Sequence, residues 1–218
     1  FRMRLPVPRQ AERSPTRCLP ASAGGLSENM WTDKRELRRI MQEARKNAPD
    51  RAVRDERIFR NLLALPAFTE ARSYFLYRSF GAEADTARIA AELARRGKEI
   101  WYPRVRGKEM ETVRWTGQLF SRGPFGIEEP VGEAENACPD VCILPMLAAD
   151  KFCRRLGYGG GYYDRYLAER GRSARKIGIC YAFQVVDALP VEEHDLPADA
   201  VVTDSGVFVR VGREEVAK

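Results

Sequence analysis

The chain has 218 residues, a formal net charge of +6 and a sequence pI near 9.2. Hydrophobic residues make up 44% and charged residues 31%, which is typical of a soluble globular protein and excludes a wholly disordered chain. No run reaches the roughly 18 uncharged apolar residues of a membrane-spanning helix. The basic balance favours anionic partners, among which phosphate-bearing small molecules rank equally with nucleic acid.

Residues 1–29 differ in composition from the rest of the chain. They contain five arginines against two acidic residues, four prolines and no apolar periodicity. This pattern favours a disordered leader before a start at Met30, although an Arg-rich, acid-poor segment is also typical of an organelle transit peptide. We therefore expect one folded domain over residues 30–218, located in the cytoplasm unless the leader directs it to an organelle.

Two helices are expected at the start of this domain. Asp33 can cap a helix that begins at Lys34, and apolar residues recur along it at helical spacing until Asn47-Ala-Pro49 ends it. A second helix is expected over residues 51–65, where Pro66 stops it.

Short apolar runs then alternate with helical segments. We expect strands at residues 73–77, 99–102, 110–115, 141–144, 176–181 and 200–203, and helices at residues 85–96 and 162–170. Pro103 should end the second strand, and residues 125–130 should form a loop. The alternation predicts an α/β fold with a mostly parallel sheet, in which ligands bind at the carboxyl ends of strands.

The strongest functional signal follows the strand at residues 141–144. It is the glycine-rich segment Arg155-Leu-Gly-Tyr-Gly-Gly-Gly-Tyr-Tyr-Asp164. Glycines let a ligand approach the main chain, and consecutive amides ahead of a helix can bind one anion. A flexible loop is the alternative for the glycines alone, and the segment lacks the Gly-Lys-Ser/Thr of a Walker P-loop. Arg155 can neutralise phosphate, and Asp164 can hold a magnesium ion carried by a triphosphate.

Further candidates lie elsewhere in the chain. Lys34 and Arg38 are four residues apart on one helix face, where they could clamp phosphates or simply face solvent. Glu83 and Asp195 are carboxylates in expected loops. The five cysteines show no zinc or redox spacing and are expected to be reduced thiols, and the single His194 argues against a histidine-rich metal site.

On these residues the chain resembles the 5-formyltetrahydrofolate cyclo-ligase family, also called methenyltetrahydrofolate synthetases, over about residues 34–207. The glycine-rich segment is similar to the family signature Arg-Leu-Gly-x-Gly-x-Gly-Tyr-Tyr-Asp. Shorter similarities are found at Leu144-Pro145, Asp150-Lys151, Lys34-x-x-x-Arg38, Glu83-Ala-Asp-Thr86, Gly126-Ile-x-Glu-Pro130 and the segment from Pro190 to Asp195.

The resemblance implies a three-layer α/β/α sandwich that uses ATP and Mg²⁺ to cyclise 5-formyltetrahydrofolate. It implies ATP binding by Lys34, Arg38, Arg155, Leu156, Gly157, Tyr158, Gly159, Gly160, Gly161, Tyr162 and Tyr163. It implies folate contacts from Arg78, Glu83, Tyr158, Gly160 and Tyr162, and metal binding by Asp164 and Asp195. Neither nucleic acid nor membrane is expected as a partner, and the protein is expected to be a monomer or homodimer.

Two positions depart from the family pattern. Arg78 stands where an apolar side chain would pack better against a pterin, and residues 150–154 replace a more usual glycine-containing turn. Two other functions stay open. One is a non-catalytic nucleotide- or RNA-binding paralogue, and the other is a sugar-phosphate isomerase or CoA-transferase-like enzyme with a carboxylate base and no ATP.

Overall fold

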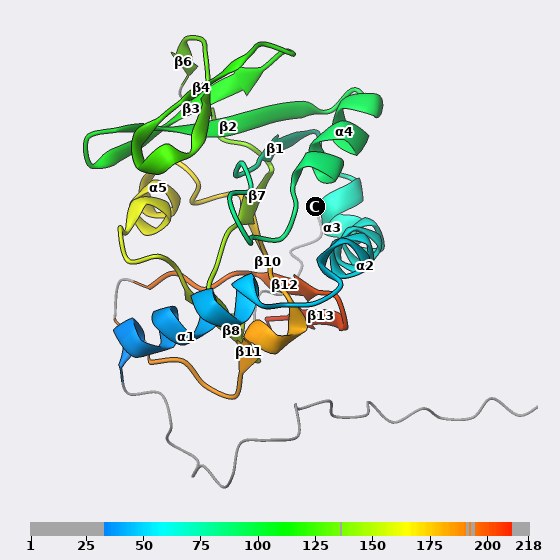
Figure 1. The fold of residues 1–218 in the computed structure, drawn as a ribbon. Coiled ribbons are helices and arrows are strands. Elements are labelled where there is room, and N and C mark those ends of the chain that lie inside the picture. Colours follow the sequence, from blue (N-terminus) through cyan, green and yellow to red (C-terminus); the bar gives the residue numbers. More distant parts are fainter. Residues whose placement is uncertain (1–32, 136, 191, 193–194, 211–218) are drawn as a thin grey trace, which may run out of the picture. The chain divides into compact units, whose positions relative to one another are not determined.

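An eight-stranded mixed sheet organises the structure, a computed structural model that describes residues 33–210 except 136, 191, 193 and 194 (Figure 1). Its order is β13-β12-β10-β7-β1-β2-β3-β6. The strands are β1 (Ser73–Phe75), β2 (Glu99–Arg106), β3 (Glu109–Trp115), β6 (Ala134–Glu135), β7 (Val141–Leu144), β10 (Arg175–Ile179), β12 (Ala200–Thr203) and β13 (Gly206–Val209). The five strands from β12 to β2 are parallel, and β13, β3 and β6 add antiparallel edges. The expected leader and His194 lie outside the described residues.

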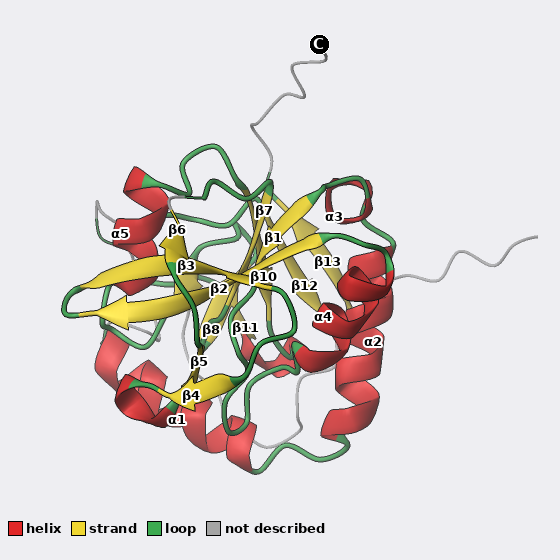
Figure 2. Cartoon of the chain, turned by 90° about the horizontal axis from the view of Figure 1, so that it is seen from above, coloured by secondary structure: helices red, strands yellow, loops and turns green. Residues whose placement is uncertain are grey.

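Helices cover both faces of this sheet (Figures 1 and 2). One face carries α2 (Arg51–Leu63), α3 (Pro66–Thr69) and α4 (Ala87–Arg95), and the other carries α5 (Tyr162–Glu169). Side chains alternate accordingly, because Tyr74 packs with the first group while the Phe75 ring stacks on Tyr166 of α5 at 4.6 Å. The expected three-layer α/β/α sandwich is confirmed.

A smaller unit lies beside the main sheet and supports the glycine-rich segment. Helix α1 (Lys34–Lys46) packs Leu37 and Met41 against Leu147, Ala148 and Leu156. The strands here are β8 (Ala148–Asp150), β9 (Arg155–Leu156) and β11 (Val185–Val186), which follows the short helix η2 (Ala182–Gln184). This packing brings α1 next to the segment that follows β9.

The expectation that Pro103 ends its strand is wrong, since β2 continues to Arg106. Strand β1 pairs with β2 only as far as Trp101. The backbone of β2 at Pro103 and Val105 therefore has no β1 residue beside it to pair with. The missing N–H of Pro103 therefore costs no ladder bond there, and the Val105 N–H instead donates to the Glu129 carboxylate at 2.8 Å.

The expected loop at residues 125–130 is also more ordered than the sequence indicated. It contains the short helix η1 (Pro124–Gly126) and strand β5 (Glu128–Pro130), which pairs with β4 (Phe120–Arg122). The Phe120 ring packs edge-on against Tyr102 at 5.2 Å, so this hairpin is anchored on the main sheet.

Candidate active site

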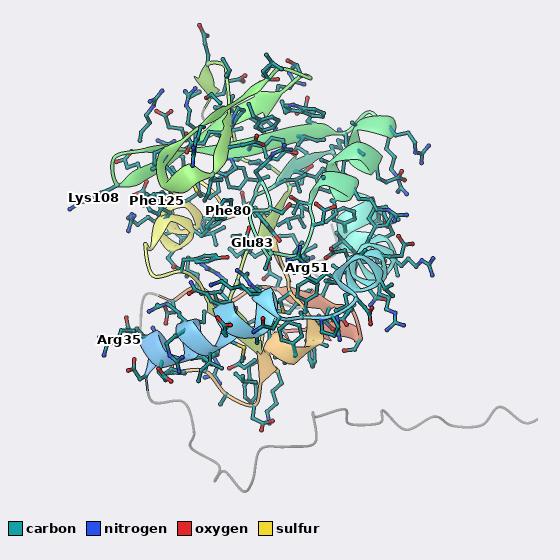
Figure 3. All side chains as sticks on the ribbon, viewed as in Figure 1. Arg35, Arg51, Phe80, Glu83, Lys108 and Phe125 are labelled. Atoms are coloured by element: carbon teal, nitrogen blue, oxygen red, sulfur yellow. The ribbon has the colours of Figure 1, made fainter. Side chains whose placement is uncertain are left out.

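A cavity of about 710 Å³ opens where β1 and β7 end. Helix α1 contributes Asp33, Lys34, Arg35 and Arg38 to it, and strands β2 and β3 contribute Pro103, Val105 and Met110. Figure 3 shows Glu83 and Phe80 near the middle of this region, with Phe125 and Lys108 toward the β2–β3 hairpin and Arg35 on α1. Every candidate site residue named from the sequence lines this one cavity, including Arg78, Asp164 and Asp195.

The glycine-rich segment has a defined shape. Gly159 has a φ of +97°, and a Cβ there would lie 3.3 Å from the Arg38 guanidinium carbon. Arg38 Nε donates to the Gly157 carbonyl at 2.9 Å. At the other end, Tyr162 Oη donates to the Gly107 carbonyl at 3.1 Å, which ties the segment to the tip of the β2–β3 hairpin. These contacts argue against a loosely flexible loop.

Two ion pairs occupy one end of the cavity, which we call the phosphate end (Lys34, Arg38, Arg155, Asp164 and Asp195). Arg155 Nη2 lies 2.5 Å from Asp164 Oδ1, and Lys34 Nζ lies 2.7 Å from Asp195 Oδ2. Burial by itself would lower the pKa of Lys34, but its hydrogen bonds to Asp195 and Glu192 outweigh burial and raise that pKa above its ordinary value. These carboxylates therefore favour the charged form of Lys34.

The carboxylates of Asp164 and Asp195 fit a magnesium ion that arrives with phosphate. Mg²⁺ in proteins is usually held by one or two carboxylates together with substrate phosphate oxygens. Over residues 33–210, apart from the four undescribed positions, no cluster of three or more His, Cys, Asp or Glu side chains forms an all-protein metal site.

Glu83 lines the same cavity together with the apolar residues Pro103, Val105, Met110, Phe125 and Ile127, a set that we call the folate end after the ligand expected from the resemblance. Its Oε1 accepts a hydrogen bond from Tyr158 Oη at 2.6 Å, and its Oε2 accepts from the Phe80 amide at 2.9 Å. Burial raises the pKa of Glu83, while these hydrogen bonds and the charge of Arg45 limit the rise. A half-buried carboxylate in a cavity that also has apolar lining residues can bind the polar edge of a flat ring.

Arg78 lines the cavity, and its guanidinium group contacts the β4–β5 hairpin. Its Nη2 and Nε donate to Glu128 Oε2 at 2.7 and 2.9 Å, and its guanidinium lies 4.4 Å from the centre of the Phe120 ring. The β4–β5 hairpin therefore holds the guanidinium through Glu128 and Phe120, and a folate contact from Arg78 stays a prediction.

The turn that replaces the family's glycine is held by a buried carboxylate. Cys153 adopts a φ of +61°, the conformation that a glycine would take without strain. Asp150 Oδ1 accepts from the amides of Phe152 and Arg154 at 2.9 and 3.0 Å, and its Oδ2 accepts from Arg154 Nε at 2.6 Å. The entry into the glycine-rich segment is therefore well supported without glycine.

Three polar residues escaped the sequence analysis. Glu192 lies 3.0 Å from Lys34 Nζ, Glu129 is buried on the cavity wall, and Arg45 donates to Tyr158 Oη at 2.6 Å. Arg45 follows Met41 by four positions and Leu37 by eight, so it shares their buried face of α1. That spacing was the available signal for Arg45, whereas Glu129 lay within a motif that was used only for resemblance.

Comparisons with known proteins agree on one family. Residues 30–204 match the 5-formyltetrahydrofolate cyclo-ligase family. The 5-formyltetrahydrofolate cyclo-ligase of Escherichia coli K12 is 31% identical over 156 residues, covering 67% of this chain and 86% of the relative. The mitochondrial 5-formyltetrahydrofolate cyclo-ligase of Arabidopsis thaliana is 29% identical, covering 83% of this chain and 77% of the relative.

Solved structures support the same assignment. The 5,10-methenyltetrahydrofolate synthetase of Aquifex aeolicus is similar with a TM-score of 0.72 and 33% identity, covering 85% of this chain and 96% of that one. The synthetase of Mycoplasma pneumoniae has a TM-score of 0.64 and 26% identity, covering 79% and 99%. Among the described helices, none has the length and apolar character to cross a membrane.

Proposed function

Because the chain belongs to the 5-formyltetrahydrofolate cyclo-ligase family, we propose that it uses ATP to convert 5-formyltetrahydrofolate to 5,10-methenyltetrahydrofolate, with release of ADP and phosphate. One observation carries the proposal. A single cavity joins a cationic, glycine-rich phosphate end to a folate end that combines the half-buried Glu83 carboxylate with apolar side chains. This arrangement suits a nucleotide and a flat heterocycle bound side by side.

The reaction has two balanced steps. The formyl oxygen attacks the γ-phosphorus of ATP, the bond to the β-phosphate oxygen breaks, and ADP leaves. N10 of the folate then attacks the activated formyl carbon, the carbon–oxygen bond breaks, and phosphate departs as N10 loses its proton. Phosphoryl transfer of this kind depends on positioning and charge neutralisation rather than on a protein nucleophile.

The phosphate end supplies those needs. Lys34, Arg38 and residues 155–163 would bind the triphosphate through their cations and main-chain amides, ahead of the uncapped first turn of α5. Arg155 Nε is buried without a hydrogen-bond partner among the described residues, which leaves a donor for a phosphate oxygen. Asp164 and Asp195 would hold Mg²⁺, which neutralises charge on the phosphates when it is bound.

The folate end would orient the formyl group. Glu83 can accept hydrogen bonds from the amino group and ring N–H of the pterin, because an ionised carboxylate is purely an acceptor. Arg78, Tyr158, Gly160 and Tyr162 would complete the folate contacts. Tyr162 already packs edge-on against Phe125 at 6.2 Å, so an aromatic surface is available for the ring.

The test is turnover. Purified protein is mixed with ATP, Mg²⁺ and 5-formyltetrahydrofolate, and the absorbance of methenyltetrahydrofolate is followed, with ATP omitted in a parallel reaction. We expect an ATP-dependent signal. Binding of both ligands without turnover would instead indicate the non-catalytic paralogue, and no affinity for ATP would favour the isomerase-like alternative. We place this activity in the cytoplasm, and fractionation of cells that express chains with and without residues 1–29 tests the organelle alternative.

A further inference from the structure

Arg45 is a buried charge that the reaction does not use directly. It lies in the last turn of α1, is 6% exposed and does not line the cavity. Its Nη2 donates to Tyr158 Oη at 2.6 Å, and its Nη1 lies 3.4 Å from the Met146 carbonyl oxygen. Its Nε is buried without a hydrogen-bond partner within the described part of the chain.

Such a side chain is costly to the fold. Removing a guanidinium from water is compensated only when its N–H groups and its charge find partners, and here one donor has none and no carboxylate bonds to it directly. An apolar residue would extend the Leu37 and Met41 stripe at lower cost. The position therefore points to a role outside stability.

Two successive hydrogen bonds connect Arg45 to the Glu83 carboxylate. Arg45 donates to the Tyr158 hydroxyl, and that hydroxyl donates its own proton to Glu83 Oε1 at 2.6 Å. Tyr158 belongs to the glycine-rich segment, whereas Glu83 stands at the folate end. The chain of contacts thus joins α1, the nucleotide segment and the folate carboxylate.

We propose that Arg45 is a positioning residue that holds the Glu83 carboxylate in its binding orientation through the Tyr158 hydroxyl. That the ligand of Glu83 is a folate rests on the function proposed above. The hydrogen-bonded link from Arg45 through Tyr158 to Glu83 does not depend on that function. Because Tyr158 carries the link, a change in the glycine-rich segment also changes how firmly Glu83 is held.

The electrostatics support this role. Burial raises the pKa of Glu83, and the Tyr158 hydrogen bond and the Arg45 charge act against that rise. Tyr77 and Tyr163 also interact electrostatically with Glu83, but burial raises their own pKa values well above the ordinary value, so both stay neutral. Arg45 is a cation whose charge acts to lower the pKa of Glu83, and its loss should raise that pKa further.

The test compares Arg45→Met with Arg45→Lys and with Arg39→Met, a control at a 69% exposed arginine on the same helix. Binding of 5-formyltetrahydrofolate without ATP is measured by calorimetry from pH 5 to pH 9, together with the melting temperature. We expect Arg45→Met to weaken folate binding about tenfold or more and to move the acid limb of binding to higher pH. Arg45→Lys should recover part of both effects, and Arg39→Met should change neither.

A second measurement separates this inference from the proposed function. Carbon NMR of glutamate-labelled, ligand-free protein follows the Glu83 carboxyl, identified by its loss in Glu83→Gln. The pKa of Glu83 should rise in Arg45→Met and in Tyr158→Phe, which removes one hydroxyl and serves if Arg45→Met does not fold. An unchanged pKa of Glu83 in a folded variant overturns the proposal, even if folate binds. A wild-type protein that binds no folate but shows the pKa change overturns the proposed function alone.

Discussion

The two ends of the cavity handle charge in different ways. At the phosphate end, Arg155 and Lys34 each contact a carboxylate directly, at 2.5 and 2.7 Å. At the folate end, Glu83 contacts a neutral hydroxyl and a main-chain amide, and its compensating cation is one residue further away. Two of the three cations at the phosphate end are thus already paired with carboxylates without ligand, whereas the folate end keeps the half-buried Glu83 carboxylate ready to accept hydrogen bonds.

This difference indicates how each ligand should bind. A magnesium nucleotide can exchange partners at the phosphate end, since its phosphates can take the cations while its metal takes the carboxylates. The net cost of separating each ion pair is then small, because every charge finds a new partner. At the folate end Glu83 has no ion pair to exchange, so affinity depends on how well its carboxylate is ionised and oriented.

Asp164→Asn should produce the largest effect. The amide oxygen still accepts a hydrogen bond from Arg155, but the charge available to a metal is gone, so we expect turnover to fall by about 100-fold or more. Steady-state kinetics measure the loss, and an unchanged circular dichroism spectrum shows that the fold is intact. Near-normal activity would remove Asp164 from the metal site and break the proposed exchange of partners.

Lys34→Met should mainly weaken nucleotide binding. One phosphate cation is lost together with its contact to Asp195, so we expect the KM for ATP to rise about tenfold with a smaller change in the KM for folate. Lys46→Met removes a 69% exposed lysine from the same helix and is the matched control. Equal effects of the two substitutions would mean that Lys34 acts only through the overall charge.

Glu83→Gln should show the opposite pattern of ligand dependence together with a gain in stability. We expect the KM for folate to rise about tenfold and the KM for ATP to change little. Burial raises the pKa of Glu83, so the folded state disfavours the ionised form; the cost is present above that pKa and disappears as pH falls through it. The melting temperature of Glu83→Gln should therefore exceed that of the wild type at pH 8 and converge with it in acid, and a lower melting temperature at pH 8 would contradict this.

Cys153→Gly should have the smallest effect. Glycine relieves the positive φ of +61° but deletes a fully buried thiol, and these contributions oppose each other within about 1 kcal/mol. Calorimetric unfolding should shift by about 4 °C or less, with ATP affinity unchanged because Asp150 holds the turn. A large fall in ATP affinity would show that the phosphate end depends on the cysteine side chain.

Sequence reasoning reached the parallel core of the sheet and part of the cavity lining, above all the glycine-rich segment. Short apolar runs such as Val141–Leu144 stand out because strands buried on both faces need uninterrupted hydrophobic residues. The antiparallel edges were harder, since β2 continues through Pro103 and β5 lies in an apparent loop. The two elements contact each other, since Glu129 accepts from the Val105 amide of β2 and Phe120 packs on Tyr102, and no local pattern contains these contacts.

In the site, too, sequence reasoning found the local motif but missed the contacts between residues that lie far apart in the sequence. The glycine-rich segment is local, so its motif exposed it. The link from Arg45 to Glu83 joins residues that lie far apart in the sequence. From the sequence alone, Arg45 resembles an ordinary cation in the last turn of a helix, beside its negative end. Its burial became visible only when the packing of α1 on β8 and β9 was known.

The contacts across the cavity also have a consequence for the order in which the protein acquires its site. The bond between Lys34 and Asp195 joins positions 161 residues apart, and that between Tyr158 and Glu83 spans 75. Contacts of such separation require the closure of long loops, and they form late in folding compared with the turns of a single helix. During synthesis Lys34 can therefore pair with Asp195 only after residue 195 has been added to the chain. A protein released before that point would contain the residues of β1, β2, β7 and β10 but would lack one carboxylate of the phosphate end.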